Sequence, residues 1–202
     1  MENFKASVRA AFRTERRRER MLEVLSQRQP DLTLILANIH DPHNVSAIYR
    51  SADAFGLEAI HLYYTDTAFP SLSRKTSASA RKWVESVRHP SLEDLALSMQ
   101  GFQVLATSCS PSSRPLRSYD LTKPTALLMG NEHSGVPEEL LKICNGELYI
   151  PMHGMIQSFN VSVAAAIILA EACRQREDAG LYETPRYTES ELNAKLGLWL
   201  ER

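Results

Sequence analysis

The alternation of short apolar segments with helical segments is the feature that most constrains how this chain folds. Six segments have the length and composition of strands, and helical segments lie between most of them. A short run such as LTLIL, apolar at nearly every position, fits a strand that is buried on both faces, as in parallel sheets covered by helices. We therefore predict an α/β fold whose mostly parallel sheet has helices on both faces. The predicted strands are residues 32–38, 58–64, 83–87, 102–108, 125–130 and 147–150, and the predicted helices between and after them are 44–55, 91–100, 137–143 and 161–176.

Both ends of the chain are predicted to form helices outside this alternation. Residues 4–28 contain neither Gly nor Pro and place apolar side chains at helical intervals, and Pro30 ends the segment. Near the other end, Thr188 and Glu191 have the spacing of a capping box before an amphipathic segment. We predict a basic N-terminal helical extension (1–30), one α/β domain (31–178) and a C-terminal helical extension (179–202).

Composition excludes several classes of protein. The chain has 202 residues, of which 44% are hydrophobic and 23% charged, as is ordinary for a soluble globular protein. Its apolar runs are shorter than the roughly 18 residues of a membrane span, and its N-terminus is charged, so we expect a cytoplasmic protein with no membrane contact. The three cysteines are far apart, and His40 and His43 lack a completing ligand cluster. We therefore expect neither disulfides nor a metal site.

The first twenty residues are strongly basic although the net charge of the whole chain is only −1. Two interpretations remain open. Such a segment can be an electrostatic handle for the phosphates of a nucleic acid. Alternatively, its arginines can pair with Glu15 and Glu19 at helical spacing on a solvated surface.

Polar residues follow three of the predicted strands, and ligands of parallel sheets bind beyond the carboxyl ends of the strands. In the first loop, NIHDPHNVSAIYRSADAFG, Asn44 stands where a helix N-cap belongs. Arg50 lies farther along this helix, with Asp53 three residues later. Either Arg50 pairs with Asp53 on the surface, or Arg50 points toward a phosphate or a hydroxyl group.

The second loop is LMGNEHSGVPEEL, and the third begins IPMHGMIQSFN. Gly130 allows the backbone to approach a ligand, Gly135 permits a turn, and Glu132 lies either in water or in a site. The second loop matches neither a P-loop nor the G-x-G-x-x-G signature of dinucleotide binding. In the third loop Asn160 can cap the helix that begins at Val161. The remaining polar side chains of this loop exceed what one cap needs, which indicates a bound polar ligand or another strand end.

Taken together, these loops resemble a known family. The ordered motifs N-x-x-x-x-x-R (Asn44 to Arg50), G-N-E-x-x-G (Gly130 to Gly135) and I-P-M-x-G-x-x-x-S-x-N-V-S-V-A (Ile150 to Ala164) resemble the SpoU/TrmH family of RNA ribose 2′-O-methyltransferases. The agreement in order and spacing extends over about residues 32–176. The segments RQPDLTLIL, PHNVSAIYRSADAFG and TSASARKWV are most similar to members that methylate a guanosine of tRNA.

The resemblance implies a reaction and an assembly. It implies transfer of a methyl group from S-adenosylmethionine to the ribose 2′-hydroxyl of guanosine 18 in the tRNA D-loop, by a homodimer in which the partner chain completes each site. It also implies a deep trefoil knot at about residues 126–176. The alternatives are a family member that methylates rRNA or another tRNA position, and a non-catalytic RNA-binding protein. Reading the 2′-hydroxyl would make DNA a poor substrate.

The resemblance also implies which residues form the site. It assigns catalytic roles to Arg50, Asn44, Glu132, Ser158 and Asn160. It assigns cofactor binding to Thr107, Gly130, Ile150, Phe159 and Ser158. It implies RNA contacts by Arg9, Arg16, Arg17, Arg20, His43, Arg174 and Arg176, although cations at 174 and 176 also favour a helix C-terminus.

The role of Arg50 needs a chemical qualification, because a guanidinium is effectively always protonated and is a poor base. We expect Arg50 to hold the hydroxyl and an adjacent RNA phosphate, with the phosphate or a transient Arg state accepting the proton. Asn44 is expected to orient Arg50 or the ribose, and Glu132 to shape the pocket. Ser158 and Asn160 are expected to hold the third loop and to contact substrate or cofactor.

Overall fold

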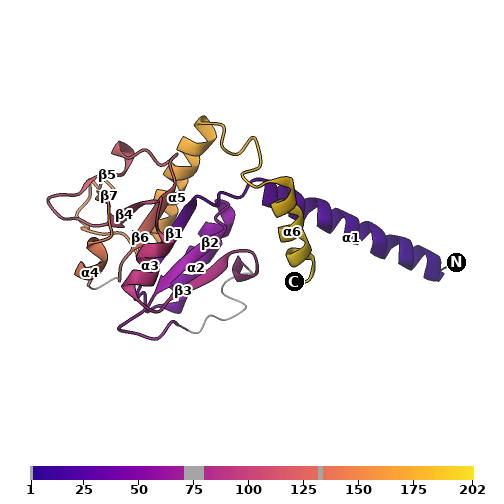
Figure 1. Cartoon of the computed structure of the whole chain (residues 1–202), viewed down its shortest axis with the longest axis horizontal. Helices are drawn as coiled ribbons and strands as arrows, with labels where there is room; N and C mark the ends of the chain where they lie inside the picture. The colour runs from indigo at the N-terminus through magenta and orange to yellow at the C-terminus, as the bar shows by residue number, and fades with distance from the viewer. Residues whose placement is uncertain (1, 71–79, 132–133) are drawn as a thin grey trace.

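The fold is a seven-stranded parallel sheet covered by helices, and α1 extends away from this body (Figure 1). The computed structural model describes residues 2–70, 80–131 and 134–202, except for the side chains of residues 2–13. The strand order across the sheet is β3-β2-β1-β6-β4-β7-β5. The strands are β1 (Leu32–Ala37), β2 (Ala59–Tyr63), β3 (Glu85–His89), β4 (Gln103–Thr107), β5 (Arg114–Pro115), β6 (Thr125–Met129) and β7 (Gly146–Tyr149). The α-helices are α1 (Glu2–Ser26), α2 (Pro42–Ala54), α3 (Leu92–Ser98), α4 (Glu138–Leu141), α5 (Val161–Asp178) and α6 (Glu189–Leu200), and the 3₁₀ turns are η1 (Ala80–Lys82) and η2 (Leu116–Ser118).

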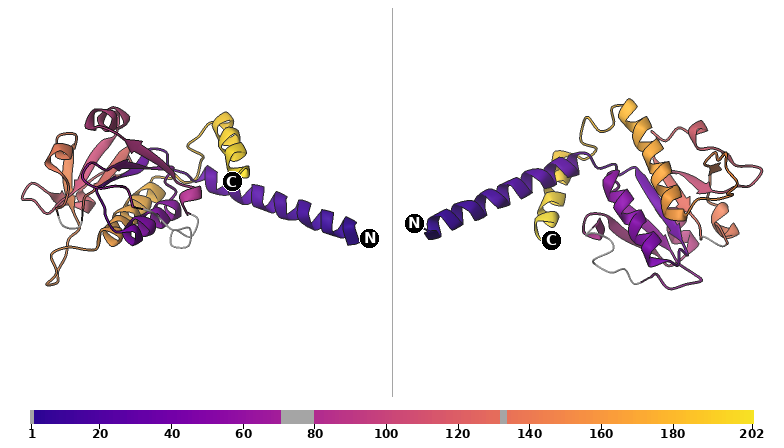
Figure 2. Two further views of the ribbon diagram at one scale, coloured as in Figure 1. Left: turned by 90° about the horizontal axis from the view of Figure 1, so that it is seen from below. Right: turned by 180° about the vertical axis from the view of Figure 1, so that it is seen from behind.

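The two faces of the sheet carry separate apolar cores, which confirms the predicted arrangement of helices. On one face, Leu34 and Leu36 of β1 pack in the cluster that includes the apolar sides of α2 and α5. On the other face, Ile35 and Ala37 pack with residues of α3 and α4. All six residues of β1 are buried, because a strand in the middle of a covered sheet has no solvent face. Figure 2 shows α2 and α5 side by side over their face of the sheet.

The first turn of α2 differs from the prediction. Asn44 is not the N-cap, because the helix begins at Pro42 and Asp41 caps it. The Asp41 carboxylate accepts a hydrogen bond from the backbone N–H of His43 at 2.8 Å. Proline suits the first helical turn, because its fixed φ is helical and its missing N–H would have no helical partner there. Asn44 is therefore inside the helix, and its side chain contacts Asn160 of a distant segment.

The ion pair considered between Arg50 and Asp53 is replaced by a long-range one. Asp53 Oδ1 accepts a hydrogen bond at 2.5 Å from Nη2 of Arg28, a residue that follows α1. The Arg28 side chain is 1% exposed and its Nη1 also donates to the carbonyl oxygen of Leu57. Because a buried guanidinium needs a counter-charge, Asp53 stabilises the junction between α1 and the sheet.

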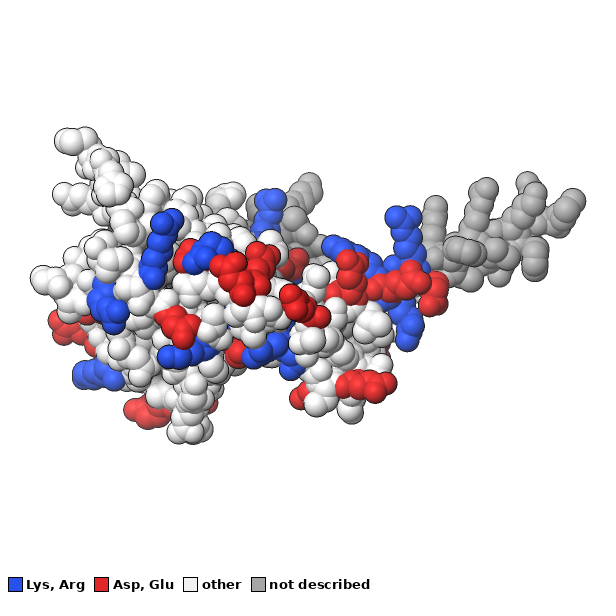
Figure 3. Space-filling view, turned by 90° about the horizontal axis from the view of Figure 1, so that it is seen from above, with Lys and Arg blue, Asp and Glu red and all other residues white. Residues whose placement is uncertain are grey.

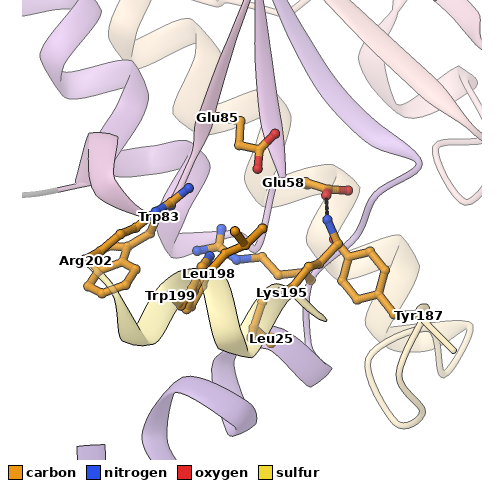
Figure 4. Close-up of a pocket in the computed structure, with 10 residues that line it drawn as sticks. Leu25, Glu58, Trp83, Glu85, Tyr187, Lys195, Leu198, Trp199 and Arg202 are labelled. Atoms are coloured by element: carbon orange, nitrogen blue, oxygen red, sulfur yellow. Dashed lines mark hydrogen bonds and ion pairs between the residues drawn. The ribbon is translucent and has the colours of Figure 1, made fainter. Parts of the chain in front are cut away.

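The helices from the two ends of the chain pack against each other. Met21 and Leu25 of α1 form an apolar cluster with Leu196 and Trp199 of α6. The predicted capping box at Thr188 and Glu191 is confirmed, with both reciprocal hydrogen bonds present. Figure 4 shows how α6 meets the sheet: Lys195 forms an ion pair with Glu58, and Trp199 lies beside Trp83. The helix α6 therefore holds the base of α1 against the body of the protein.

The predicted strands match the observed ones within about two residues, apart from β5. The pair Arg114–Pro115 lies outside the predicted strands and helices, and both residues are exposed at the edge of the sheet. Proline lacks an N–H for strand pairing and is tolerated at such an edge.

Among the described residues, no helix is long and apolar enough to cross a membrane. Over the same part of the chain, no cluster of His, Cys, Asp or Glu is arranged to hold a metal ion.

Candidate active site

A cleft of about 460 Å³ opens at the carboxyl ends of β4, β6 and β7, beside the start of α5. This is the edge of a parallel sheet where ligands bind. Its size is within the range of small-molecule sites. The described residues that line it carry no Asp, Glu, Lys or Arg. They are Thr107, Ser108, Cys109, Met129, Gly130, Asn131, Gly135, Leu148, Tyr149, Ile150, Met152, Ser158, Phe159, Asn160, Val161, Ala164 and Ile168.

The cleft brings together every residue predicted to bind the cofactor: Thr107, Gly130, Ile150, Phe159 and Ser158. They come from three loops that are far apart in the sequence. Asn160 lines the cleft as well. The combination of apolar walls with hydroxyl, amide and backbone groups suits a ligand with flat apolar faces and polar edges.

Gly130 is required by the packing of its own loop. A Cβ atom at this position would lie 2.3 Å from the carbonyl carbon of Gly135, closer than any real contact. Two reciprocal backbone hydrogen bonds, each of 2.9 Å, join Asn131 to Gly135. Gly135 has a φ of +71°, which confirms the predicted turn. The glycine thus lets backbone approach backbone at the wall of the cleft.

Replacing Gly130 with alanine is expected to displace the backbone of Gly135 and Val136 and to weaken cofactor binding by at least about tenfold, because the new methyl group cannot fit. Gly154→Ala is the matched control, since a Cβ at Gly154 meets no other atom within 4 Å. Isothermal titration with S-adenosylmethionine measures both affinities. Equal affinities for the two variants would contradict this explanation of Gly130.

Asn160 links the start of α5 to the start of α2. Its Oδ1 accepts hydrogen bonds from Ser162, 2.9 Å from the backbone nitrogen and 2.6 Å from the hydroxyl, which confirms the predicted cap of α5. Its Nδ2 donates to Oδ1 of Asn44 at 3.0 Å. A single amide therefore uses its acceptor for the helix and its donor for Asn44. This bond brings two of the predicted catalytic residues together at the rim of the cleft.

Arg50 is not part of this cleft. It is exposed on α2 and is absent from the lining, and it lies six positions after Asn44. At about 1.5 Å per residue, Arg50 lies roughly 9 Å farther along the helix axis. Within the part of the chain that the structure describes, Arg50 makes no ion pair. Glu132, the remaining predicted catalytic residue, lies outside the described residues.

Sequence reasoning missed a polar network behind the cleft. Asn131 Nδ2 donates to the carbonyl oxygen of Asn38 at 2.7 Å and contacts Nδ1 of His40 at 2.6 Å. Asn38 is buried, has a positive φ of 51°, and accepts hydrogen bonds from the backbone of Thr65 and Asp66. The positive φ suits asparagine, which tolerates the left-handed region. The network ties the loops that follow β1, β2 and β6 to one another.

A second missed feature holds the loop after β4. The Glu147 carboxylate accepts hydrogen bonds from the hydroxyls of Ser110 at 3.0 Å and Ser112 at 2.7 Å. Hydrogen bonds from Ser108 and Ser112 lower the pKa of Glu147. Glu147 therefore stays ionised and fixes the loop that carries Ser108 and Cys109 at the cleft. The sequence gives no local signal for this contact, because Ser110 and Ser112 are 35 residues or more from Glu147.

The residues predicted to contact RNA are in different surroundings. Arg16, Arg17 and Arg20 are exposed on α1, and His43 is exposed at the start of α2; the side chain of Arg9 lies outside the described residues. On the face shown in Figure 3, Lys and Arg side chains lie among Asp and Glu side chains. The charges of the described residues on this face are therefore mixed, with no patch of a single sign.

Near the end of α5, Arg174 and Arg176 differ sharply. Arg174 is exposed and forms ion pairs with Glu171 at 2.8 Å and Asp178 at 2.7 Å. The prediction that Arg176 contacts RNA is wrong, because its side chain is fully buried. Its guanidinium binds Asp31, Gln29 and the carbonyl oxygens of residues 31, 121 and 123. No donor nitrogen of Arg176 is left for a phosphate.

Comparison with known proteins identifies the family. The model of the SpoU rRNA Methylase family matches residues 31–170, which include the sheet and the cleft. The chain belongs to this family. The SpoU match covers the three predicted motifs and leaves out α1 and α6, the helices that pack on each other.

Several SpoU proteins are similar to this chain over most of its length. A curated relative from Thermus thermophilus, named tRNA (guanosine(18)-2′-O)-methyltransferase, is 47% identical over 192 residues, covering 94% of this chain and 98% of the relative. The crystal structure of the A. aeolicus TrmH/SpoU tRNA modifying enzyme has a TM-score of 0.85 and 40% identity, covering 93% of this chain and 96% of that one. The SpoU methyltransferase AviRb from Streptomyces viridochromogenes, solved with AdoMet, has a TM-score of 0.64 and 28% identity, covering 74% and 62%.

Proposed function

We propose that this chain is a tRNA (guanosine(18)-2′-O)-methyltransferase that uses S-adenosylmethionine. The observation that carries the proposal is the 47% identity to an enzyme of that name over nearly the whole of both chains. This similarity extends over 94% of this chain, well beyond residues 31–170 that the family model matches. It favours a tRNA substrate over the alternatives of rRNA or a different tRNA position.

The cleft fits the cofactor. Phe159, Leu148 and Ile168 provide apolar surface, and Thr107 and Ser158 provide hydroxyl groups. The described lining has no charged side chain, so backbone groups and neutral side chains would hold the polar parts of the cofactor. When bound, S-adenosylmethionine supplies an electrophilic methyl group.

The protein's own residues position the ribose. Arg50 is exposed and makes no ion pair among the described residues, so its guanidinium is available to hold a ribose hydroxyl and the neighbouring phosphate. The hydroxyl proton then passes to that phosphate or to a transient state of Arg50, because a stable guanidinium does not accept it. Asn44 and Asn160, joined at 3.0 Å, hold the starts of α2 and α5 in register beside the substrate. We expect Glu132 to shape the pocket, and Ser158, which lines the cleft, to contact the substrate or the cofactor.

We propose further that the site is completed in a homodimer. Arg50 is outside the cleft of its own chain, which supports a site formed by the cleft of one chain and Arg50 of another. The loop after β7 adds an apolar surface for such contacts: Met155 is 99% exposed and Ile156 63%, and this loop projects from the body (Figure 2). Val163 on α5 is also exposed.

Four further expectations remain predictions from the resemblance and the sequence. They are the trefoil knot at about residues 126–176, the three-part division of the chain, a cytoplasmic location and the exclusion of DNA.

A methyl-transfer assay tests the substrate. The purified chain, labelled S-adenosylmethionine and an unmodified tRNA transcript are expected to give a single 2′-O-methylguanosine at position 18. A transcript with 2′-deoxyguanosine at that position is the matched control and is expected to accept no label, because it lacks the nucleophile. Nucleoside mapping of the product identifies the site. Label in rRNA but not in tRNA would replace this proposal by the rRNA alternative, and binding without transfer would favour the non-catalytic one.

A further inference from the structure

A second hollow lies where α1 leaves the body, and the methyl-transfer site described above does not use it. Its volume is about 300 Å³. The residues that line it come from both ends of the chain and from the central domain. They are Arg17, Arg20, Met21, Val24, Asp53, Trp83 and Trp199, which we call the tryptophan groove.

Aromatic and apolar side chains form the floor of the tryptophan groove. The ring centroids of Trp83 and Trp199 are 4.8 Å apart, with the ring planes tilted by 53° (Figure 4). Trp199 is 7% exposed, and Trp83 is half-buried. Met21 and Val24 of α1 pack in the same cluster. These are the only tryptophans of the chain. Indole rings bordered by aliphatic side chains form a surface on which a planar base can stack.

The charge of the tryptophan groove is positive at its rim. Arg17 and Arg20 are exposed, and Arg17 makes no ion pair within the described residues. Arg20 pairs at 2.8 Å with Glu23, on an exposed surface where such a pair is weak and exchangeable. The only carboxylate in the lining is Asp53, and Arg28 neutralises it at 2.5 Å. A ligand with negative charges at its edge and a flat base complements this arrangement.

The position of the tryptophan groove relates it to the proposed substrate. Asp53 lies three residues after Arg50 on α2, about 4.5 Å farther along the helix axis. A strand of RNA held by Arg50 therefore reaches the groove within the length of a few nucleotides. Proteins that bind unpaired nucleotides with little sequence preference combine aromatic side chains, on which bases stack, with cationic side chains along the phosphate backbone of the nucleic acid.

We propose that the tryptophan groove binds a nucleobase of the tRNA substrate near the methylated nucleotide. In this arrangement the base lies against Trp83, and Arg17 and Arg20 hold the flanking phosphates. The inference rests on the proposed function, because it takes the ligand to be the RNA substrate. It adds to that function a stacking subsite that joins Trp83, inside the family match, to residues of α1 and α6, which lie outside it.

Because both tryptophans line the groove, intrinsic tryptophan fluorescence reports on it directly. Titrating the full chain with tRNA transcript, without cofactor, is expected to quench this fluorescence in a saturable way. The double variant Arg17→Ala/Arg20→Ala is expected to need roughly tenfold more tRNA for half-saturation. Its KM for tRNA is expected to rise by a similar factor, with an unchanged KM for S-adenosylmethionine. Arg18→Ala is the matched control, since Arg18 is on the same helix but not in the groove, and it is expected to behave as wild type.

Trp83→Ala and Trp83→Phe separate stacking from folding. Both variants are first compared with wild type by circular dichroism. Phenylalanine keeps a flat ring and is expected to retain most of the tRNA affinity, whereas alanine loses it. If tRNA is methylated normally while fluorescence does not change and the arginine variants match Arg18→Ala, the groove proposal is wrong. Fluorescence that changes on dilution but not with tRNA would assign the groove to a second copy of the chain. Absence of methyl transfer by the wild type would instead remove the proposed function itself.

Discussion

Arg50→Ala is expected to lower the rate of methyl transfer to tRNA by roughly 10²–10⁴-fold, the range seen when a positioned group that acts on the reacting proton or charge is removed. S-adenosylmethionine affinity is expected to stay near that of wild type, because Arg50 does not line the cofactor cleft. Single-turnover methyl transfer and calorimetric titration measure the two effects separately.

Arg50→Lys is a graded variant for the same position. Lysine keeps the charge but cannot hold a hydroxyl and a phosphate with a planar fork, so we expect partial recovery of tRNA affinity and little recovery of rate. A rate within a few-fold of wild type for Arg50→Ala would remove Arg50 from the mechanism.

The same variant tests whether Arg50 acts across a dimer. Arg50→Ala and Gly130→Ala damage different halves of a shared site, Arg50 outside the cleft and Gly130 in its wall. Mixing and re-equilibrating the two impaired chains is expected to restore part of the activity, because some mixed dimers contain one intact site. Activity that never recovers in mixtures would place Arg50 and the cleft of the same chain in one site.

The fold was predictable from the sequence in the strands whose residues are all buried, because burial requires apolar residues there. Every residue of β1 is buried, so its composition indicates a central strand of a covered sheet. The edge strand β5 has no such signature, since Arg114 and Pro115 are exposed and only backbone pairing with β7 defines them. At α2, the Asp41–Pro42 pair is the stronger start signal, and reliance on Asn44 placed the cap three residues late.

The candidate site was predictable from the sequence where the motif residues themselves line the cleft. It was less predictable where a contact depends on a residue far away in the sequence. The cleft gathers the motif residues around Gly130 and Phe159 as expected. Asp53 has a local candidate partner at i−3, but its ion pair is with Arg28, 25 residues earlier. Helical spacing reveals only neighbours on the same helix, and tertiary packing selected the other partner.

Arg176→Ala is expected to destabilise the protein by roughly 3–5 kcal/mol, the usual cost of removing one partner from a buried, hydrogen-bonded ion pair. The loss leaves the Asp31 carboxylate with Arg186 as its remaining charged partner and leaves the carbonyl oxygens of Leu121 and Lys123 without this donor. These groups join the end of α5 to the start of β1 and to the segment before β6. Urea denaturation followed by circular dichroism measures the loss.

Arg174→Ala is the matched control two residues away on the same helix. Arg174 lowers the pKa of Glu171 to about 2, but its own side chain is exposed and its ion pairs are within one helix. Screening by water makes such pairs weak, so the unfolding midpoint is expected to change little. Any effect of Arg174→Ala is expected in tRNA affinity, with its salt dependence reduced. An Arg176→Ala chain that is as stable as wild type but binds tRNA less tightly would reverse the two assignments.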